Sequence, residues 1–156
     1  MDFLIKELDK DYDVIDLKNK KDKIVFTIST SKTSFICPYC SQPSSKIHSY
    51  YYREVQDLPI MNKQSFLIIK SRKIFCQNKA CNHKTFSEQH IFLSRNAKKT
   101  NRLMEHILFT SAELSSVGSS KLLRSENIAA GKSMICELVK KKRLPLWISL
   151  RFFGFV

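Results

Sequence analysis

The chain contains 156 residues, 43% of them hydrophobic and 26% charged, so it can bury one medium-sized core or two small ones. Three glycines and four prolines exclude a low-complexity or collagen-like chain. The sequence holds no apolar run of about 18 residues, and its first ten residues carry acids and lack the apolar h-region of a signal peptide. We therefore expect no transmembrane helix and no secretory signal, and we assign the chain to the cytoplasm.

The distribution of charge is uneven. The formal net charge is +13, and the whole excess lies after Cys37, because the basic and acidic side chains before it cancel. A basic excess confined to one part of a chain favours a polyanionic partner such as duplex DNA. A lysine-rich, solvated surface is the alternative interpretation.

The first half of the sequence predicts strands. Residues 1–23 are expected to be an N-terminal lead-in, in which the run from Asp9 to Asp13 is too polar for a core. Alternation of apolar and polar side chains then predicts strands at residues 24–30, 46–56 and 64–76. We expect Pro59 to end the second strand, because proline has no N–H for the ladder, and a turn to follow at 61–63. Residues 24–95 are thus predicted to hold a small antiparallel sheet.

Two cysteine pairs lie where predicted strands end. Their spacings are C-x2-C and C-x4-C, and the four residues are Cys37, Cys40, Cys76 and Cys81. Two such pairs complete a tetrahedral, all-thiolate site, which suits a structural Zn²⁺. The alternatives are buried thiols, an iron–sulfur cluster, or His83 as a ligand in place of Cys81.

From residue 96 the periodicity becomes helical. Thr100 is a predicted N-cap for a helix at 101–114, and Gly118-Ser119-Ser120 is expected to break the chain before a short helix at 119–125. After a turn at 127–131, a third helix ends in a basic run, with Cys136 as a small core residue. The predicted fold is α+β: a zinc-ribbon-like sheet followed by a helix-turn-helix bundle at 96–143.

Basic and polar side chains of the sheet and helices are candidate DNA contacts. They are Arg53, Arg72, Lys73, Lys98, Lys99, Arg102, Lys132, Ser133, Lys140 and Lys141. Lys132 and Ser133 open the third helix and are the candidates for reading bases, whereas the others suit phosphates. Residues 144–156 form an apolar tail that we interpret as a product of a frameshift.

Several motifs together resemble one family. They are Cys37-Pro-x-Cys40, Ile47-His48-Ser49-x-Tyr51-x-Arg53, Asp57-Leu58-Pro59, Arg72-Lys73-x-Phe75-Cys76-x-Asn78-x-x-Cys81 and Thr85-Phe86-x-Glu88. In this order they resemble the zinc-binding head of ISL-three family transposases. The resemblance implies a zinc-binding domain, a helix-turn-helix, and binding to the terminal inverted repeats of an insertion sequence. It also implies a catalytic domain with three carboxylates, whose first aspartate has no counterpart here.

The sequence therefore predicts the DNA-binding, N-terminal fragment of a transposase, without an enzymatic activity of its own. Its expected partners are insertion-sequence DNA and an intact transposase or a second copy, and neither a membrane nor a small-molecule substrate. A free-standing zinc-ribbon and helix-turn-helix regulator is the main alternative. A zinc-dependent enzyme is disfavoured, because four cysteine ligands leave the metal no open position.

Overall fold

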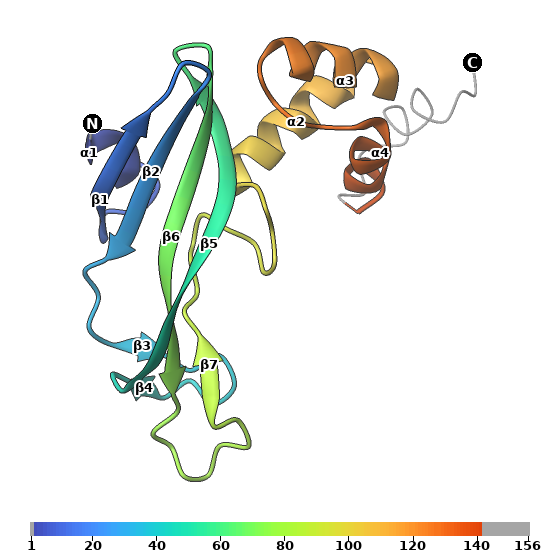
Figure 1. Cartoon of the computed structure of the whole chain (residues 1–156). Coiled ribbons are helices and arrows are strands. Elements are labelled where there is room, and N and C mark those ends of the chain that lie inside the picture. Colours follow the sequence, from blue (N-terminus) through green and yellow to red (C-terminus); the bar gives the residue numbers. More distant parts are fainter. Residues whose placement is uncertain (1, 142–156) are drawn as a thin grey trace.

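The computed structural model describes residues 2–141, and Figure 1 shows a twisted sheet with a group of helices beside one of its ends. The segment 144–156, and with it the interpretation of a frameshifted tail, lies outside the described residues. The strands are β1 (Tyr12–Asn19), β2 (Lys23–Thr30), β3 (Phe35–Ile36), β4 (Pro43–Ser44), β5 (Ile47–Ile60), β6 (Lys63–Phe75) and β7 (Thr85–Ser87). The helices are α1 (Asp2–Lys6), α2 (Asn101–Glu113), α3 (Ser116–Ser125) and α4 (Lys132–Lys141).

The main sheet is mixed rather than antiparallel. Its strand order is β1-β2-β6-β5, with β7 paired to the end of β6. Strands β2 and β6 run parallel, with Lys23 opposite Gln64 and Ser29 opposite Lys70, whereas the other pairs are antiparallel. The prediction of a purely antiparallel sheet is wrong for this one pair. Alternation determines which face of a strand is buried, but it contains no information on the direction of the neighbouring strand.

Strand β1 belongs to the sheet, although residues 1–23 carry no strong strand pattern. It pairs with β2 from Tyr12 opposite Thr30 to Asn19 opposite Ile24. The prediction that the run from Asp9 to Asp13 lies outside the core is wrong for Tyr12 and Asp9, which are 2% and 7% exposed, whereas Lys10 and Asp13 are exposed. Tyr12 and Asp9 are buried because each finds a partner within the fold.

One face of the sheet forms the main core. Alternate residues of β2 and β6 point into it, and α1 and the segment after β7 cover it. Its buried members are Ile5, Tyr12, Ile24, Phe26, Ile28, Val55, Leu67, Ile69, Phe92 and Leu93. The period-two burial of β2 confirms the strand predicted at residues 24–30.

Strand β5 does not end at Asp57-Leu58-Pro59. It continues to Ile60, and the pairing with β6 shifts register between Asp57 and Ile60. Proline is tolerated here because the ladder is already interrupted. Met61 and Asn62, both with positive φ, then form the predicted turn into β6.

The helices α2, α3 and α4 pack around a second core. Its buried members are Leu103, Ile107, Leu123, Ile128, Ala130, Ile135, Leu138 and Val139, and Cys136 packs against it half-buried. The N-cap at Thr100 is confirmed, since its hydroxyl accepts from the Leu103 N–H. The break predicted at Gly118 is wrong: Gly118 lies inside α3, and the chain turns at Leu114 instead. The Ser115 hydroxyl caps α3 there by accepting from the Gly118 N–H.

Among residues 2–141, none of the helices combines the length and the apolar character that crossing a membrane requires.

Candidate metal centre and nucleic-acid interface

The four paired cysteines meet at one end of the sheet. Cys37 and Cys40 lie between β3 and β4, Cys76 follows β6, and Cys81 lies in the connection to β7. Their sulfur atoms all lie within 4.8 Å of one another, and those of Cys40 and Cys76 are 3.6 Å apart. A Zn²⁺ ion with four thiolates at about 2.3 Å holds its sulfurs about 3.8 Å apart. The cluster therefore fits a tetrahedral ion.

Backbone hydrogen bonds shape the first cysteine pair. The Cys37 N–H donates to the Gln42 carbonyl, and the Ser41 N–H donates back to the Cys37 carbonyl, both at 2.9 Å. Ser41 takes a positive φ of 58°, which turns the chain back after Cys40. This tight turn points the sulfur atoms of both cysteines toward the same point.

The loop around the second cysteine pair accounts for the wider spacing between Cys76 and Cys81. The Cys76 N–H donates to the Lys84 carbonyl at 2.9 Å, which joins the ends of the loop. Within it, the Asn78 side chain accepts from the Ala80 N–H at 2.9 Å, and the Cys81 N–H donates to the Asn78 carbonyl at 3.1 Å. This local turn around Asn78 takes up the additional residues and brings Cys81 back beside Cys76.

The electrostatics of the cluster favour a cation. A backbone hydrogen bond from Gln42 lowers the pKa of Cys40 to about 7, so its thiolate is available near neutral pH. For Cys76 a backbone hydrogen bond from Asn78 also favours the thiolate, but burial and the neighbouring thiols raise its pKa to about 12. Thiolates crowded together repel one another unless a metal ion lies between them.

The apolar core beside the cysteines is small. It consists of Phe35, Cys37, Ile74 and Phe86. A core of this size is a weak support for two short strands, so a metal ion would contribute much of the local stability. His83, the alternative to Cys81, stacks on Tyr39 with ring centroids 3.5 Å apart, and it is not one of the four residues that meet.

Residues 33–81 match a family described as the zinc-finger of transposase IS204/IS1001/IS1096/IS1165. The match and the converging cysteines support a zinc ribbon of the ISL-three transposase type at these residues. The matched residues contain both cysteine pairs, and Zn²⁺ is the metal that this family and the cysteine geometry support. No curated protein and no solved structure matched the chain.

The sequence-predicted DNA contacts on the sheet and the helices divide into two groups. The exposed group consists of Lys73, Lys98, Lys132, Ser133, Lys140 and Lys141. The remaining four are half-buried: Arg53, Arg72, Lys99 and Arg102. The exposed group does not lie on one element. Lys73 lies near the end of β6, beside the zinc ribbon, whereas four of the others lie on α4.

The four half-buried cations bind groups of the protein itself, and for Arg102 this group is the carboxylate of Asp57. Arg53 donates to the Ala97 carbonyl at 3.2 Å, and Lys99 donates to the Gln56 side chain at 2.7 Å. Arg72 donates to the carbonyls of Thr30 and Lys32, at 2.9 and 2.6 Å. These contacts hold segments of the fold together, and sequence reasoning had no signal for them because each joins residues more than 35 positions apart.

A polar junction attaches the helices to the sheet. Gln56 exchanges backbone hydrogen bonds with the segment before α2, accepting from Thr100 at 3.0 Å and donating to the Lys98 carbonyl at 2.9 Å. Its side chain donates to the Asn127 carbonyl at 3.3 Å. Asn127 in turn donates to the Asn62 carbonyl in the β5–β6 turn at 2.9 Å. The helical core is therefore tied to β5 at several points.

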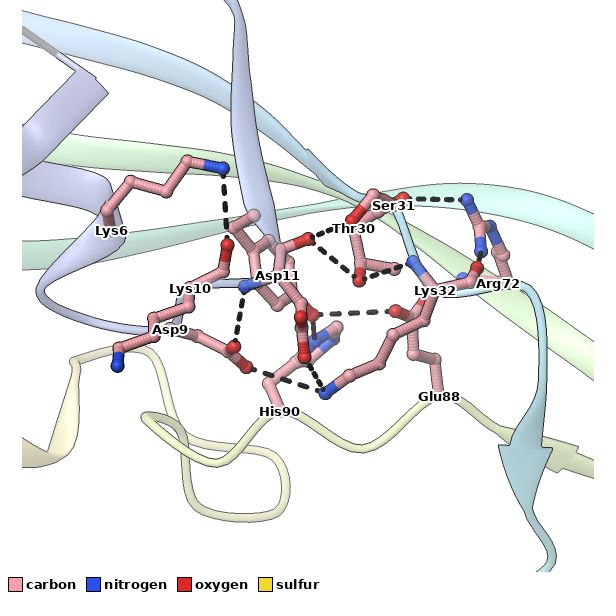
Figure 2. A network of polar contacts seen from close by, with 11 residues as sticks. Lys6, Asp9, Lys10, Asp11, Thr30, Ser31, Lys32, Arg72, Glu88 and His90 are labelled. Atoms are coloured by element: carbon pink, nitrogen blue, oxygen red, sulfur yellow. Dashed lines mark hydrogen bonds and ion pairs between the residues drawn. The ribbon is translucent and has the colours of Figure 1, made fainter.

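Figure 2 shows a second polar network, between the ends of β1 and β2 and the segment after β7. His90 hydrogen-bonds to Ser71 at 3.0 Å and to the Tyr12 hydroxyl, and the Arg72 N–H donates to Glu88 at 3.0 Å. Burial lowers the pKa of His90 to about 4 and raises the pKa of Glu88. His90, a lone histidine in the sequence, is thus a neutral, buried structural group at neutral pH.

Proposed function

We propose that this chain is the DNA-binding part of an insertion-sequence transposase and that it recognises the terminal inverted repeats of its element. The observation that carries the proposal is the transposase zinc ribbon at residues 33–81, whose four cysteines converge within 4.8 Å. In the proposal Cys37, Cys40, Cys76 and Cys81 are the zinc ligands. The basic excess after Cys37 supports a polyanionic partner.

The helices α2, α3 and α4 act as a helix-turn-helix, with α4 as the reading helix. Lys132 and Ser133 at the start of α4 are exposed, as base-reading side chains must be. Lys140 and Lys141 at its other end are also exposed and suit phosphate contacts. The half-buried cations Lys99 and Arg102 hold the segment at the start of α2 on β5, and Arg72 holds the end of β2, rather than touching DNA.

The role of these residues is binding rather than strand cleavage. Two-metal phosphoryl transfer requires carboxylates that hold two ions side by side. Within the described residues, the cysteine cluster is the group whose metal-ligating side chains lie close enough to share an ion. Four thiolates fill the coordination shell of Zn²⁺ and leave no position for substrate. The five cysteines form no disulfide, which fits a cytoplasmic protein.

The test is binding of the zinc-loaded chain to a duplex that carries the terminal inverted repeat, compared with a scrambled duplex, at a series of salt concentrations. We expect tighter binding to the repeat and a steep loss of affinity with salt, because phosphate contacts release counterions. A flat salt response, or equal affinity for both duplexes at every salt concentration, would contradict the proposal.

A further inference from the structure

A polar pocket lies between the zinc ribbon and the segment that leads to α2. Its volume is about 570 Å³. Tyr39, from the first cysteine pair, forms one wall, Tyr51 and Arg53 of β5 form a second, and residues 87–90 and 93–96 form the third. The volume falls within the range of about 300–1,000 Å³ that is usual for pockets holding small ligands. It can hold one nucleotide, but it is too small for a duplex.

The cationic groups of the pocket suit an anion. Arg95 is exposed and makes no hydrogen bond or ion pair with the described residues, and Arg53 donates one hydrogen bond, to the Ala97 carbonyl. Each guanidinium therefore keeps donors for a ligand. Two arginines that line one pocket suit a phosphate, which accepts paired N–H donors.

The floor of the pocket does not oppose an anion. Glu88 and His90 line it, and both belong to the buried network of Figure 2. The carboxylate of Glu88 already accepts from the Arg72 N–H and from the Tyr12 hydroxyl, and the charges of Arg72 and Lys32 lie near it. Its negative charge is thus compensated by partners within the fold, which leaves Arg53 and Arg95 to determine the sign of the ligand.

The remaining lining suits a nucleobase. Tyr39 is 49% exposed, and its ring is held in place by the stack with His83. Tyr51 is half-buried in the second wall, and the side-chain amides of Gln89 and Asn96 lie in the third. Aromatic rings stack on bases of any sequence, and amides pair with base edges.

We propose that this pocket binds a single unpaired nucleotide of a DNA strand, with its phosphate at Arg53 and Arg95 and its base beside Tyr39 and Tyr51. The inference rests on the proposed function, because the duplex next to the unpaired nucleotide is held by the contacts described there. It adds a preference for DNA that is partly single-stranded. Since Tyr39 lies between Cys37 and Cys40, the zinc ion also holds one wall of the nucleotide site.

The experiment compares two probes on the zinc-loaded chain by fluorescence anisotropy: a paired duplex, and the same duplex with an unpaired extension of four nucleotides. We expect the extended probe to bind about tenfold more tightly, as one stacked base contributes. Arg95→Ala should remove this preference and leave the affinity for the paired duplex within twofold. Lys21→Ala removes an equal charge from the exposed β1–β2 turn, at the other end of the sheet, and should keep the preference.

One further probe and two variants of Tyr39 separate the contribution of the base from that of the phosphate. An extension of abasic nucleotides should lose most of the gain in affinity. Tyr39→Ala should behave like Arg95→Ala, whereas Tyr39→Phe should keep the preference, with zinc content measured to show that the ribbon is intact. The nucleotide site is contradicted if the wild-type chain binds duplex but ignores the extension, or if Arg95→Ala keeps the preference. Failure to bind either probe would overturn the proposed function as well.

Discussion

Asp57 and Arg102 connect the sheet to the helices through a two-point ion pair. The carboxylate of Asp57 is buried, with its side chain 1% exposed, and it accepts from two nitrogens of Arg102. The Thr100 hydroxyl donates to the same carboxylate at 2.6 Å while it caps α2. The start of α2 is therefore held on β5 by one buried acid.

Removing the arginine should destabilise the protein, because it leaves the buried carboxylate without its cation. We expect Arg102→Ala to lower the free energy of unfolding by about 2–4 kcal/mol, measured by urea denaturation of the zinc-loaded chain. Lys98→Ala removes an exposed cation close by in sequence and should change stability by less than about 0.5 kcal/mol. Equal stability of the two variants would show that the pair does not hold the junction.

The zinc assignment predicts metal content directly. Purified protein should contain about one zinc ion per chain. The double variant Cys37→Ser/Cys76→Ser removes one ligand from each pair and should contain almost none, by elemental analysis. Cys136→Ser changes the fifth cysteine, which packs against the helical core, and should keep the full zinc content. Wild-type zinc in the double variant would exclude these residues as ligands.

The two ends of α4 should affect DNA binding differently. Replacing Lys132 and Ser133 by alanine should reduce the preference for the inverted repeat over a scrambled duplex by about tenfold, since base contacts are lost. Lys141→Ala should weaken binding to both duplexes alike and lower the slope of affinity against salt by about one. Anisotropy titrations on both duplexes measure these effects. If Lys141→Ala reduced the preference for the repeat and the Lys132/Ser133 variant weakened binding to both duplexes alike, α4 would not be the reading helix.

His90 should make the stability of the fold depend on pH. Its pKa is lowered to about 4 in the folded protein, against 6.5 ordinarily, because the ring is buried. As pH falls below about 6.5 the unfolded chain takes up a proton that the folded chain does not, so stability is lost as the solution is acidified.

His90→Gln removes this contribution. Between pH 7 and 5.5 the wild-type protein should lose about 1 kcal/mol more stability than the variant, measured by urea denaturation with zinc in excess. Glu88, whose raised pKa acts in the opposite direction, is present in both proteins and affects both alike. Identical pH dependence of the two proteins would show that folding does not shift the pKa of His90.

Much of the site could be predicted from the sequence because its signals are local. The spacings within the cysteine pairs predict a metal centre, the alternation at 24–30 predicts β2, and a threonine before an apolar helical pattern predicts the cap of α2. Each of these depends on residues a few positions apart, whose geometry is set by the backbone. The resemblance to transposase zinc ribbons rests on the same local motifs.

Other features depend on which distant segments meet, and only the tertiary structure decides that. The parallel pairing of β2 with β6, the place of β1 in the sheet and the His90 network are long-range relationships that no spacing predicts. The same applies to Arg102: in the sequence it is one more cation in a basic run, but in the fold a buried carboxylate lies beside it. A buried charge requires a partner, and the partner is chosen by packing rather than by sequence distance.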